Sequence, residues 1–213
     1  MPHTTLFPDS VALVVASEAM WNTPLCREEE ALIEGAVQKR RREFRAGRHA
    51  AHEALRQLGA PHRPILRGTR REPAWPAGFV GTIAHCKGLG VAACAKQQTV
   101  TGLGIDVEPL EPLPEGVARY IYTDEESTCQ TIQELPQRLL FCAKESLYKC
   151  YYPLLGEFFG FQSVRLSFDT EKKSFAFRPT KQCEVGFPRE LSFHGRYQIG
   201  PSHLYAACYL LRR

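Results

Sequence analysis

Gly104-Ile105-Asp106-Val107-Glu108 lies at the middle of the 213-residue chain and predicts a strand with two unlike faces. Side chains two residues apart in a strand point to the same face. Asp106 and Glu108 therefore project together, while Ile105 and Val107 project the other way. Hard oxygen ligands favour Mg²⁺, which keeps several waters and binds one or two carboxylates together with substrate phosphates. The stretch therefore fits either a magnesium site or a solvated strand face.

A second informative stretch, Phe-Cys-Ala-Lys-Glu-Ser-Leu-Tyr-Lys at 141–149, falls in a long helix predicted over Glu134–Tyr151. Glu145 and Lys149 are four residues apart and share one face of that helix, in the favourable Glu-to-Lys order. The two residues fit an ordinary surface ion pair. They also fit a third carboxylate at a metal with a lysine beside it, and the helix alone does not distinguish these interpretations.

Basic residues gather earlier in the chain. The window Lys39–Arg48 holds six Lys or Arg against Glu43 alone, and Arg67–Arg71 holds three more. Guanidinium groups match the geometry of phosphates. His85, in the stretch GTIAHCKG at 81–88, ends a predicted strand, where a histidine can donate a hydrogen bond to a phosphate oxygen. These residues fit a polyanion site, but also a solvated basic helix face, a structural histidine or a nucleic-acid-binding patch.

The charge of the chain is unevenly distributed. The formal net charge is +4, yet residues 1–101 carry 14 basic and 9 acidic side chains, whereas residues 102–213 carry 13 basic and 14 acidic ones. The window 106–126 holds seven acids against Arg119 alone. Separate basic and acidic windows suit a polyanion that is held partly by arginines and partly through a metal.

The composition indicates a folded protein. With 44% hydrophobic residues and a small net charge, the chain is not of the disordered class. None of its eight cysteines forms a CxxC pair or a zinc-finger spacing, which favours reduced cysteines in a cytoplasmic protein. The apolar run Val11–Ala16 is too short for a signal peptide or a membrane span.

Hydrophobic periodicity predicts an α+β chain of two lobes, each with a long helix and about three strands. The first long helix is expected over Arg27–Leu58, with Gly35 and Gly47 as candidate breaks, and a Pro-interrupted linker over Pro109–Pro114 separates lobes 1–108 and 109–213. Thr123 is expected to cap a helix that begins with three acids. The predicted strands are 11–16, 79–85, 91–96, 102–107, 164–168, 174–178, 191–197 and 204–211.

The order of these stretches along the chain is more specific than any one of them. A basic helix (RRREFRAGR), a loop reading RREPAWP, then GTIAHCKG, GIDVEP and FCAKESLYK follow one another between residues 40 and 149. This order resembles the 4′-phosphopantetheinyl transferase superfamily, in its Sfp/EntD-like bacterial branch, over about residues 38–168. Members move the 4′-phosphopantetheine arm of coenzyme A to a serine of an apo acyl or peptidyl carrier protein and release adenosine 3′,5′-bisphosphate.

The resemblance implies roles for individual residues. It makes Asp106, Glu108 and Glu145 the Mg²⁺ ligands, with the pyrophosphate of coenzyme A completing the shell. It places Lys149 beside the reacting phosphate and His85 on a coenzyme A phosphate. Glu145 is the candidate base, directly or through a water on the metal, while Lys149 is the alternative partner of the reacting groups.

The resemblance also assigns the nucleotide contacts. It pairs Arg48 with Arg40 or Arg41 at the 3′-phosphate region: the family pattern favours Arg40, whereas helical spacing favours Arg41. Arg67 is a further phosphate ligand by its place in the pattern. A serine that is common before the family's histidine is absent here, where Thr82-Ile83-Ala84 precede His85.

For the whole protein, the resemblance implies two pseudo-symmetric lobes with the active site at their junction. It further implies a cytoplasmic monomer that acts in polyketide, nonribosomal peptide or siderophore synthesis, without nucleic acid or membrane partners. Carrier proteins are acidic and are expected near residues 109–130, although that segment is itself acidic apart from Arg119. A Mg²⁺-dependent phosphohydrolase and a nucleic-acid-binding module are the alternatives.

Overall fold

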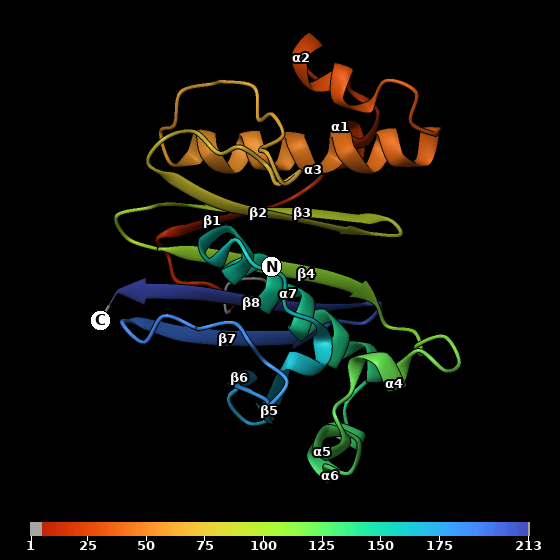
Figure 1. Ribbon diagram of the computed structural model, residues 1–213. Coiled ribbons are helices and arrows are strands. Elements are labelled where there is room, and N and C mark those ends of the chain that lie inside the picture. Colours follow the sequence, from red (N-terminus) through yellow and green to blue (C-terminus); the bar gives the residue numbers. More distant parts are fainter. Residues whose placement is uncertain (1–5, 213) are drawn as a thin grey trace.

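The computed structural model describes residues 6–212, which form two antiparallel sheets, each covered by one long helix (Figure 1). The α+β class predicted from the sequence is confirmed. The strands are β1 (Val11–Val15), β2 (Phe79–Cys86), β3 (Leu89–Lys96), β4 (Gly102–Pro109), β5 (Val164–Asp169), β6 (Ser174–Pro179), β7 (Leu191–Ile199) and β8 (His203–Arg212). The helices are α1 (Glu18–Asn22), α2 (Arg27–Glu30), η1 (Ala31–Ile33), α3 (Gln38–Gln57), α4 (Ala118–Ile121), α5 (Asp124–Ser127), α6 (Gln130–Gln133), α7 (Gln137–Leu155) and η2 (Phe161–Ser163).

The first sheet has the order β1-β3-β2 and packs against α3. One stripe of α3 is made of small side chains, including Ala50, Ala51 and Ala54, and is completely buried against β3 and its neighbours. Such a stripe lets a helix lie close to a sheet, because few atoms separate the two backbones. Gly59, in the left-handed conformation, follows the helix end, as the sequence predicts.

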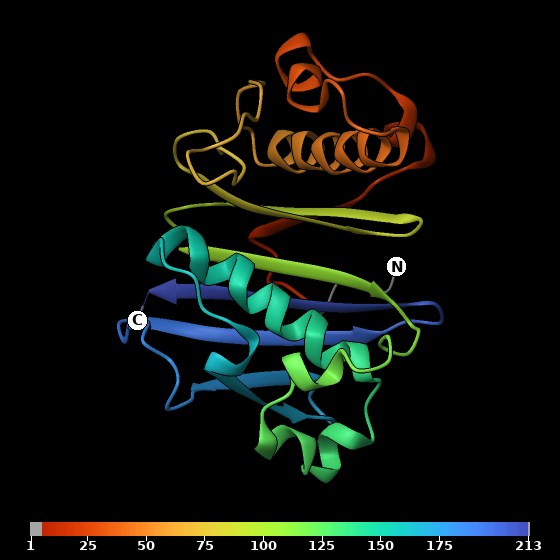
Figure 2. The same ribbon diagram turned by 45° about the vertical axis from the view of Figure 1, so that its right-hand side comes forward.

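The second sheet has the order β4-β8-β7-β6-β5, and α7 runs diagonally across β4 and β8 (Figures 1 and 2). Aromatic rings from α7, from the strands and from the segment 158–187 fill the space beneath the helix, with Tyr151 in contact with Phe177, Phe187 and Phe193. This second core is larger than the first and fixes the direction of α7.

The two sheets meet where β2 lies beside β4. The hydroxyl of Thr82 accepts a hydrogen bond from the backbone N–H of Ile105 across this junction, at 3.2 Å. Ile105 and Val107 pack into an apolar cluster that both halves of the chain supply. By hydrogen bonding β4 belongs to the second sheet, with β8 as its partner. The division of the chain at residue 108 stays a prediction.

The region predicted as one helix over Arg27–Leu58 is three elements, which corrects that prediction. Gly35 adopts a left-handed conformation and ends the short α2–η1 segment before α3 begins. Gly47 does not break α3: a side chain there would collide with Ile83 of β2, so this glycine lets helix and strand approach. Among residues 6–212, no helix combines the length and the apolar character needed to cross a bilayer.

Candidate functional site

The strand–helix contact between β4 and α7 positions the carboxylates. A side chain at Gly104 would collide with the backbone oxygen of Ser146, so only glycine allows α7 to lie this close to the strand. One turn further along the helix, the Lys149 ammonium donates to Asp106 Oδ1 at 2.6 Å. Two motifs that lie about forty residues apart in sequence therefore form one site.

The three predicted metal ligands differ in their present partners. Asp106 is buried, and its second oxygen, Oδ2, has no hydrogen-bond partner among the described residues. Glu108 accepts a hydrogen bond from Arg138 at 2.8 Å. The side chain of Glu145 makes neither a hydrogen bond nor an ion pair with any residue of 6–212. The site thus contains more acceptor oxygens than donors to satisfy them.

The carboxylates do not form a closed cage. Within residues 6–212, no three His, Cys, Asp or Glu side chains converge closely enough to hold a metal ion in their present rotamers. Asp106 Oδ2 is nevertheless a buried acceptor to which no group of the described chain donates, and a cation would satisfy it. Carboxylate oxygens are also the ligands that Mg²⁺ prefers. The donor set therefore fits a magnesium ion that the substrate phosphates help to bind.

Burial controls the protonation of this site. Desolvation raises the pKa of Glu145 and of Glu108, and the neighbouring charge of Asp106 adds to both effects, although Lys149 and Arg138 oppose them. For Lys149, burial works against the ammonium form, but the charge and hydrogen bond of Asp106 outweigh it, so its pKa is raised. Lys149 therefore stays protonated, and Glu145 binds its proton more tightly than an exposed glutamate does.

His85 lies at the end of β2, on the other side of the junction. Arg40 donates from Nη1 to His85 Nε2 at 2.8 Å. Because a guanidinium can only donate, this contact assigns the ring proton to Nδ1, which faces Glu43 at 3.8 Å. Burial, with a smaller contribution from Arg40, lowers the pKa of His85. The charges of Lys149 and Asp106 also act on the pKa of His85, so His85 lies close to the carboxylate site.

Arg48 is a buried member of the predicted phosphate-binding residues. Its Nε and Nη1 atoms have no hydrogen-bond partner in the described chain, and the guanidinium lies over the ring of Phe44 at 4.9 Å. Burial lowers the pKa of Arg48 to about 10, and Glu29, whose Oε1 lies 3.9 Å from Arg48 Nε, raises it. Arg48 thus combines a buried charge with unused donors.

The remaining predicted arginines are arranged differently. Arg41 donates from Nε to the carbonyl oxygen of Ala36, near the start of α3, rather than facing His85. Arg67 donates to the carbonyl oxygen of Leu32 and lies close enough to Arg48 for their charges to interact. Arg40, Arg48, Arg67 and His85, which we call the basic group, are linked by these contacts and charge effects, whereas the side-chain hydrogen bond of Arg41 goes to the backbone.

A small apolar pocket of about 150 Å³ opens beside Glu145. Its walls come from Tyr148 of α7 and from the segment 158–161, in which the Phe158 side chain is largely exposed. A wider hollow of about 540 Å³ lies between α5 and the β5–β6 strands, but it contains none of the predicted site residues. Of these two hollows, only the smaller is lined by a predicted site residue, Glu145.

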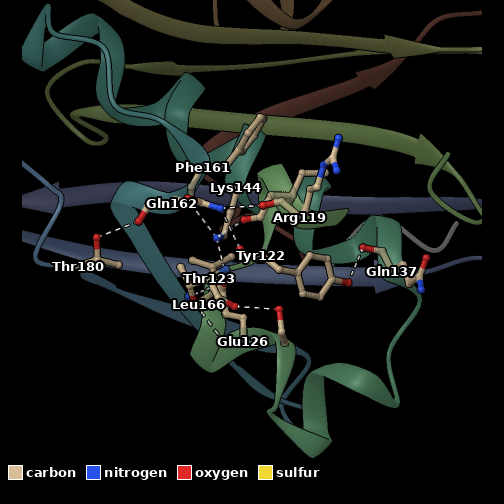
Figure 3. Close-up of polar contacts among 12 residues, drawn as sticks. Arg119, Tyr122, Thr123, Glu126, Gln137, Lys144, Phe161, Gln162, Leu166 and Thr180 are labelled. Atoms are coloured by element: carbon tan, nitrogen blue, oxygen red, sulfur yellow. Dashed lines mark hydrogen bonds and ion pairs between the residues drawn. The ribbon is translucent and has the colours of Figure 1, made fainter. Parts of the chain in front are cut away.

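Sequence reasoning missed the role of Lys144, which precedes Glu145. Its ammonium donates to Glu126 at 2.7 Å and to the carbonyl oxygens of Ile121 and Phe161, both at 2.8 Å (Figure 3). These contacts tie α7 to the segments on both sides of it, and so support Glu145. The sequence signal was a lysine directly before the predicted ligand Glu145, but helical spacing does not reveal the partners of that lysine.

Two other residues near the site also escaped the sequence analysis. Glu43 was counted only as the exception in a basic window, yet it faces His85. Arg138 was not singled out, yet it pairs with Glu108. Neither contact could be predicted, because each joins residues that lie about thirty to forty positions apart.

Comparisons with known proteins agree with the motif order. A model described as the 4′-phosphopantetheinyl transferase N-terminal domain matches residues 28–95, and the 4′-phosphopantetheinyl transferase superfamily model matches residues 102–206. The chain is 39% identical over 179 residues to the 4′-phosphopantetheinyl transferase PptT of Mycobacterium tuberculosis, covering 82% of this chain and 78% of the relative.

A second relative is the 4′-phosphopantetheinyl transferase Npt of Nocardia iowensis, which is 38% identical over 192 residues, with 84% and 86% of the two chains covered. Among solved structures, a holo-[acyl-carrier-protein] synthase of Thermotoga maritima matches with 20% identity and a TM-score of 0.39. That match covers 54% of this chain and 65% of the other, and is too distant to support a conclusion.

Proposed function

The chain belongs to the 4′-phosphopantetheinyl transferase superfamily, and we propose from its geometry how it moves the 4′-phosphopantetheine arm of coenzyme A to a serine of a carrier protein. The observation that carries the proposal is the buried Oδ2 of Asp106, which has no hydrogen-bond partner within residues 6–212, while Lys149 donates to the other oxygen of the same carboxylate. Such an acceptor is costly in a folded protein unless a ligand completes it.

We assign Asp106, Glu108 and Glu145 as the residues that would hold Mg²⁺. A bound magnesium ion would neutralise the pyrophosphate of coenzyme A and so stabilise the departing bisphosphate. To bind the ion, Glu108 would have to give up part of its hydrogen bonding with Arg138. The side chain of Glu145 would have to turn towards Asp106. Each carboxylate retains at least one oxygen that no donor occupies, which supports this assignment.

The transfer itself moves one phosphoryl centre. The serine oxygen of the carrier attacks the phosphorus that bears the pantetheine arm, and the bond from that phosphorus to the bridging oxygen breaks. Adenosine 3′,5′-bisphosphate leaves. We assign Glu145 as the acceptor of the serine proton, because it lines the small pocket and its side chain makes no hydrogen bond or ion pair within residues 6–212. Lys149 cannot take that role while Asp106 keeps it protonated, so its charge serves the reacting phosphate.

The basic group supplies the nucleotide contacts. Arg48 with its unused donors, Arg40 with His85, and Arg67 suit the phosphates on the adenosine side of coenzyme A. Between the two candidates from the sequence, the contact of Arg40 with His85 favours Arg40 over Arg41. Residues 1–108 would thus hold the nucleotide and the first carboxylates, and residues 109–213 would supply Glu145 and Lys149.

The pocket beside Glu145 suits the pantetheine arm, which is largely apolar between its amides. Tyr148 and the 158–161 segment provide aromatic walls next to the proposed base. The relatives PptT and Npt are named as 4′-phosphopantetheinyl transferases, and other relatives are enterobactin synthase components. We therefore propose carrier proteins of siderophore, polyketide or peptide synthesis as partners. We also propose a monomer in the cytoplasm that binds no nucleic acid.

One assay tests this function against its alternatives. The protein is incubated with coenzyme A, Mg²⁺ and several apo carrier proteins, and each carrier is weighed by mass spectrometry. Transfer predicts a mass gain of one 4′-phosphopantetheine on the carrier, and chelation of divalent metal should remove it. Release of products without carrier modification would indicate a phosphohydrolase, and no reaction with any carrier would refute the proposal.

A further inference from the structure

Glu29 of α2 is a buried carboxylate outside the carboxylate site, and three elements hold it. It accepts hydrogen bonds from His52 of α3 at 2.9 and 3.0 Å, from the backbone N–H of Ile65 at 3.1 Å and from the Cys26 thiol at 3.2 Å. About 1% of the residue is exposed. A carboxylate with this many donors has a fixed position and keeps its charge, and the pKa of Glu29 is lowered because His52 and the other donors outweigh burial.

Arg48 faces this carboxylate without hydrogen bonding to it. Its Nε lies 3.9 Å from Glu29 Oε1, and neither Nε nor Nη1 has a partner within residues 6–212. A buried guanidinium needs a counter-charge to remain buried. Here the counter-charge is supplied at a distance that leaves the donors of the guanidinium unused.

We infer that Glu29 is a positioning residue for coenzyme A recognition, which holds the charged Arg48 in place while leaving its donors free for a phosphate of the nucleotide. This inference rests on the proposed role of Arg48. Glu29 itself touches no substrate in this scheme: its hydrogen-bond capacity is used by His52, Ile65 and Cys26. Glu29 therefore interacts with Arg48 through its charge and not through a hydrogen bond.

Glu30, the next residue, provides a matched contrast. It binds Arg45 through two hydrogen bonds of 2.8 Å, and it also accepts from the backbone N–H of Leu25. Both donors that Arg45 directs at Glu30 are used, so this pair fastens α2 to α3 and leaves no free donor there for a phosphate. Glu29 and Glu30 thus share a helix and a chemical type, but only Glu29 acts on an arginine with free donors.

The test is steady-state kinetics with coenzyme A and with 3′-dephospho-coenzyme A for Glu29→Gln, Glu30→Gln, Arg48→Met and the double variant Glu29→Gln/Arg48→Met. We expect Glu29→Gln to raise the KM for coenzyme A about tenfold with kcat changed less than twofold. The KM for 3′-dephospho-coenzyme A should change less than that for coenzyme A. Glu30→Gln should leave both KM values within twofold, even if it lowers Tm.

The double variant separates positioning from a general effect on stability. If Glu29 acts through Arg48, adding Glu29→Gln to Arg48→Met should not raise KM further. A tenfold rise from Glu29→Gln in the Arg48→Met background would overturn the inference, as would an unchanged KM in Glu29→Gln while Arg48→Met raises it. An unchanged KM in Arg48→Met would refute the proposed role of Arg48 and this inference together. If Glu29→Gln does not fold, Glu29→Asp replaces it, with an expected rise of about threefold.

Discussion

Lys144 on α7 and Arg48 on α3 are both buried cations on the long helices of the two halves, yet their surroundings are opposite. Lys144 donates to Glu126, Ile121 and Phe161 and so uses all three of its donors (Figure 3). Arg48 leaves Nε and Nη1 without a partner among the described residues. From this comparison we expect a satisfied buried charge to stabilise the fold, and an unsatisfied one to bind a ligand.

The same distinction separates two buried acids of the window 106–126. Glu126 accepts from the backbone N–H of Thr123 and of Leu166 as well as from Lys144, and it completes the capping box of α5. Asp106 has one satisfied oxygen and one that is empty. If the distinction is general, changes at satisfied groups should lower stability, and changes at unsatisfied groups should lower activity.

The largest effect is expected at Asp106. Replacing it by Asn keeps the shape but removes the charge that Lys149 and the proposed metal require, so transfer to a carrier should fall by at least about 10⁴-fold, or about 5.5 kcal/mol of transition-state stabilisation. Carrier mass gain measures the activity, and circular dichroism checks that the variant is folded. Near-normal turnover in the folded variant would show that the carboxylate assignment is wrong.

Lys144→Met should produce the next largest effect, on stability. The change leaves Glu126 buried without its cation and two carbonyl oxygens without a donor, which should cost about 3–5 kcal/mol of unfolding free energy. Urea unfolding measures it. A Lys144→Met variant that is as stable as the original chain, but inactive, would place Lys144 among the ligand-binding cations and break the comparison.

The sequence predicted the parts of this contrast that depend on local spacing. The shared face of Glu145 and Lys149 follows from helical periodicity, and the shared face of Asp106 and Glu108 follows from the alternation of a strand. The cap at Thr123 is confirmed, because its hydroxyl accepts from the backbone N–H of Glu126. All eight predicted strands are present.

What the sequence did not predict depends on contacts between distant segments. Glu29 and Glu30 fall in the stretch 27–58 that was predicted as one long helix. They lie instead on a separate short helix that covers the face of α3 carrying Arg45, Arg48 and His52. Lys144 and Lys149 are lysines of the same helix, and Asp106 and Glu126 are both carboxylates of the acidic window 106–126. Only the positions of the surrounding backbone donors and acceptors distinguish them.

Arg48→Met should show a smaller effect of the opposite kind to Lys144→Met. Because the Arg48 side chain makes no hydrogen bond within residues 6–212, and Glu29 keeps its donors from His52, Ile65 and Cys26, the unfolding free energy should change by no more than about 1 kcal/mol. The KM for coenzyme A should rise about tenfold to a hundredfold, equal to about 1.4–2.7 kcal/mol, while kcat at saturation stays within about threefold. A large loss of kcat at saturating coenzyme A would contradict a contact limited to the nucleotide.

The smallest effect is expected at Glu30, where the pair with Arg45 is fully formed but partly exposed. Its hydrogen bonds with Arg45 hold the pKa of Glu30 at about 2 in the folded chain, below its ordinary value of 4.5. The pair therefore stabilises the folded state above pH 4.5, and this contribution is lost as the pH falls through about 2.

Since water screens the pair, Glu30→Gln should lower the unfolding free energy by only about 1 kcal/mol at pH 7. The difference from the original chain should vanish in acid, as measured by urea unfolding across this range. Glu53→Gln is the matched control, because the Glu53–Arg56 pair also holds its glutamate pKa at about 2, but its arginine side chain is 73% exposed against 19% for Arg45, so its loss should not be measurable. An equal effect at Glu53 would show that burial does not decide the contribution of these satisfied pairs.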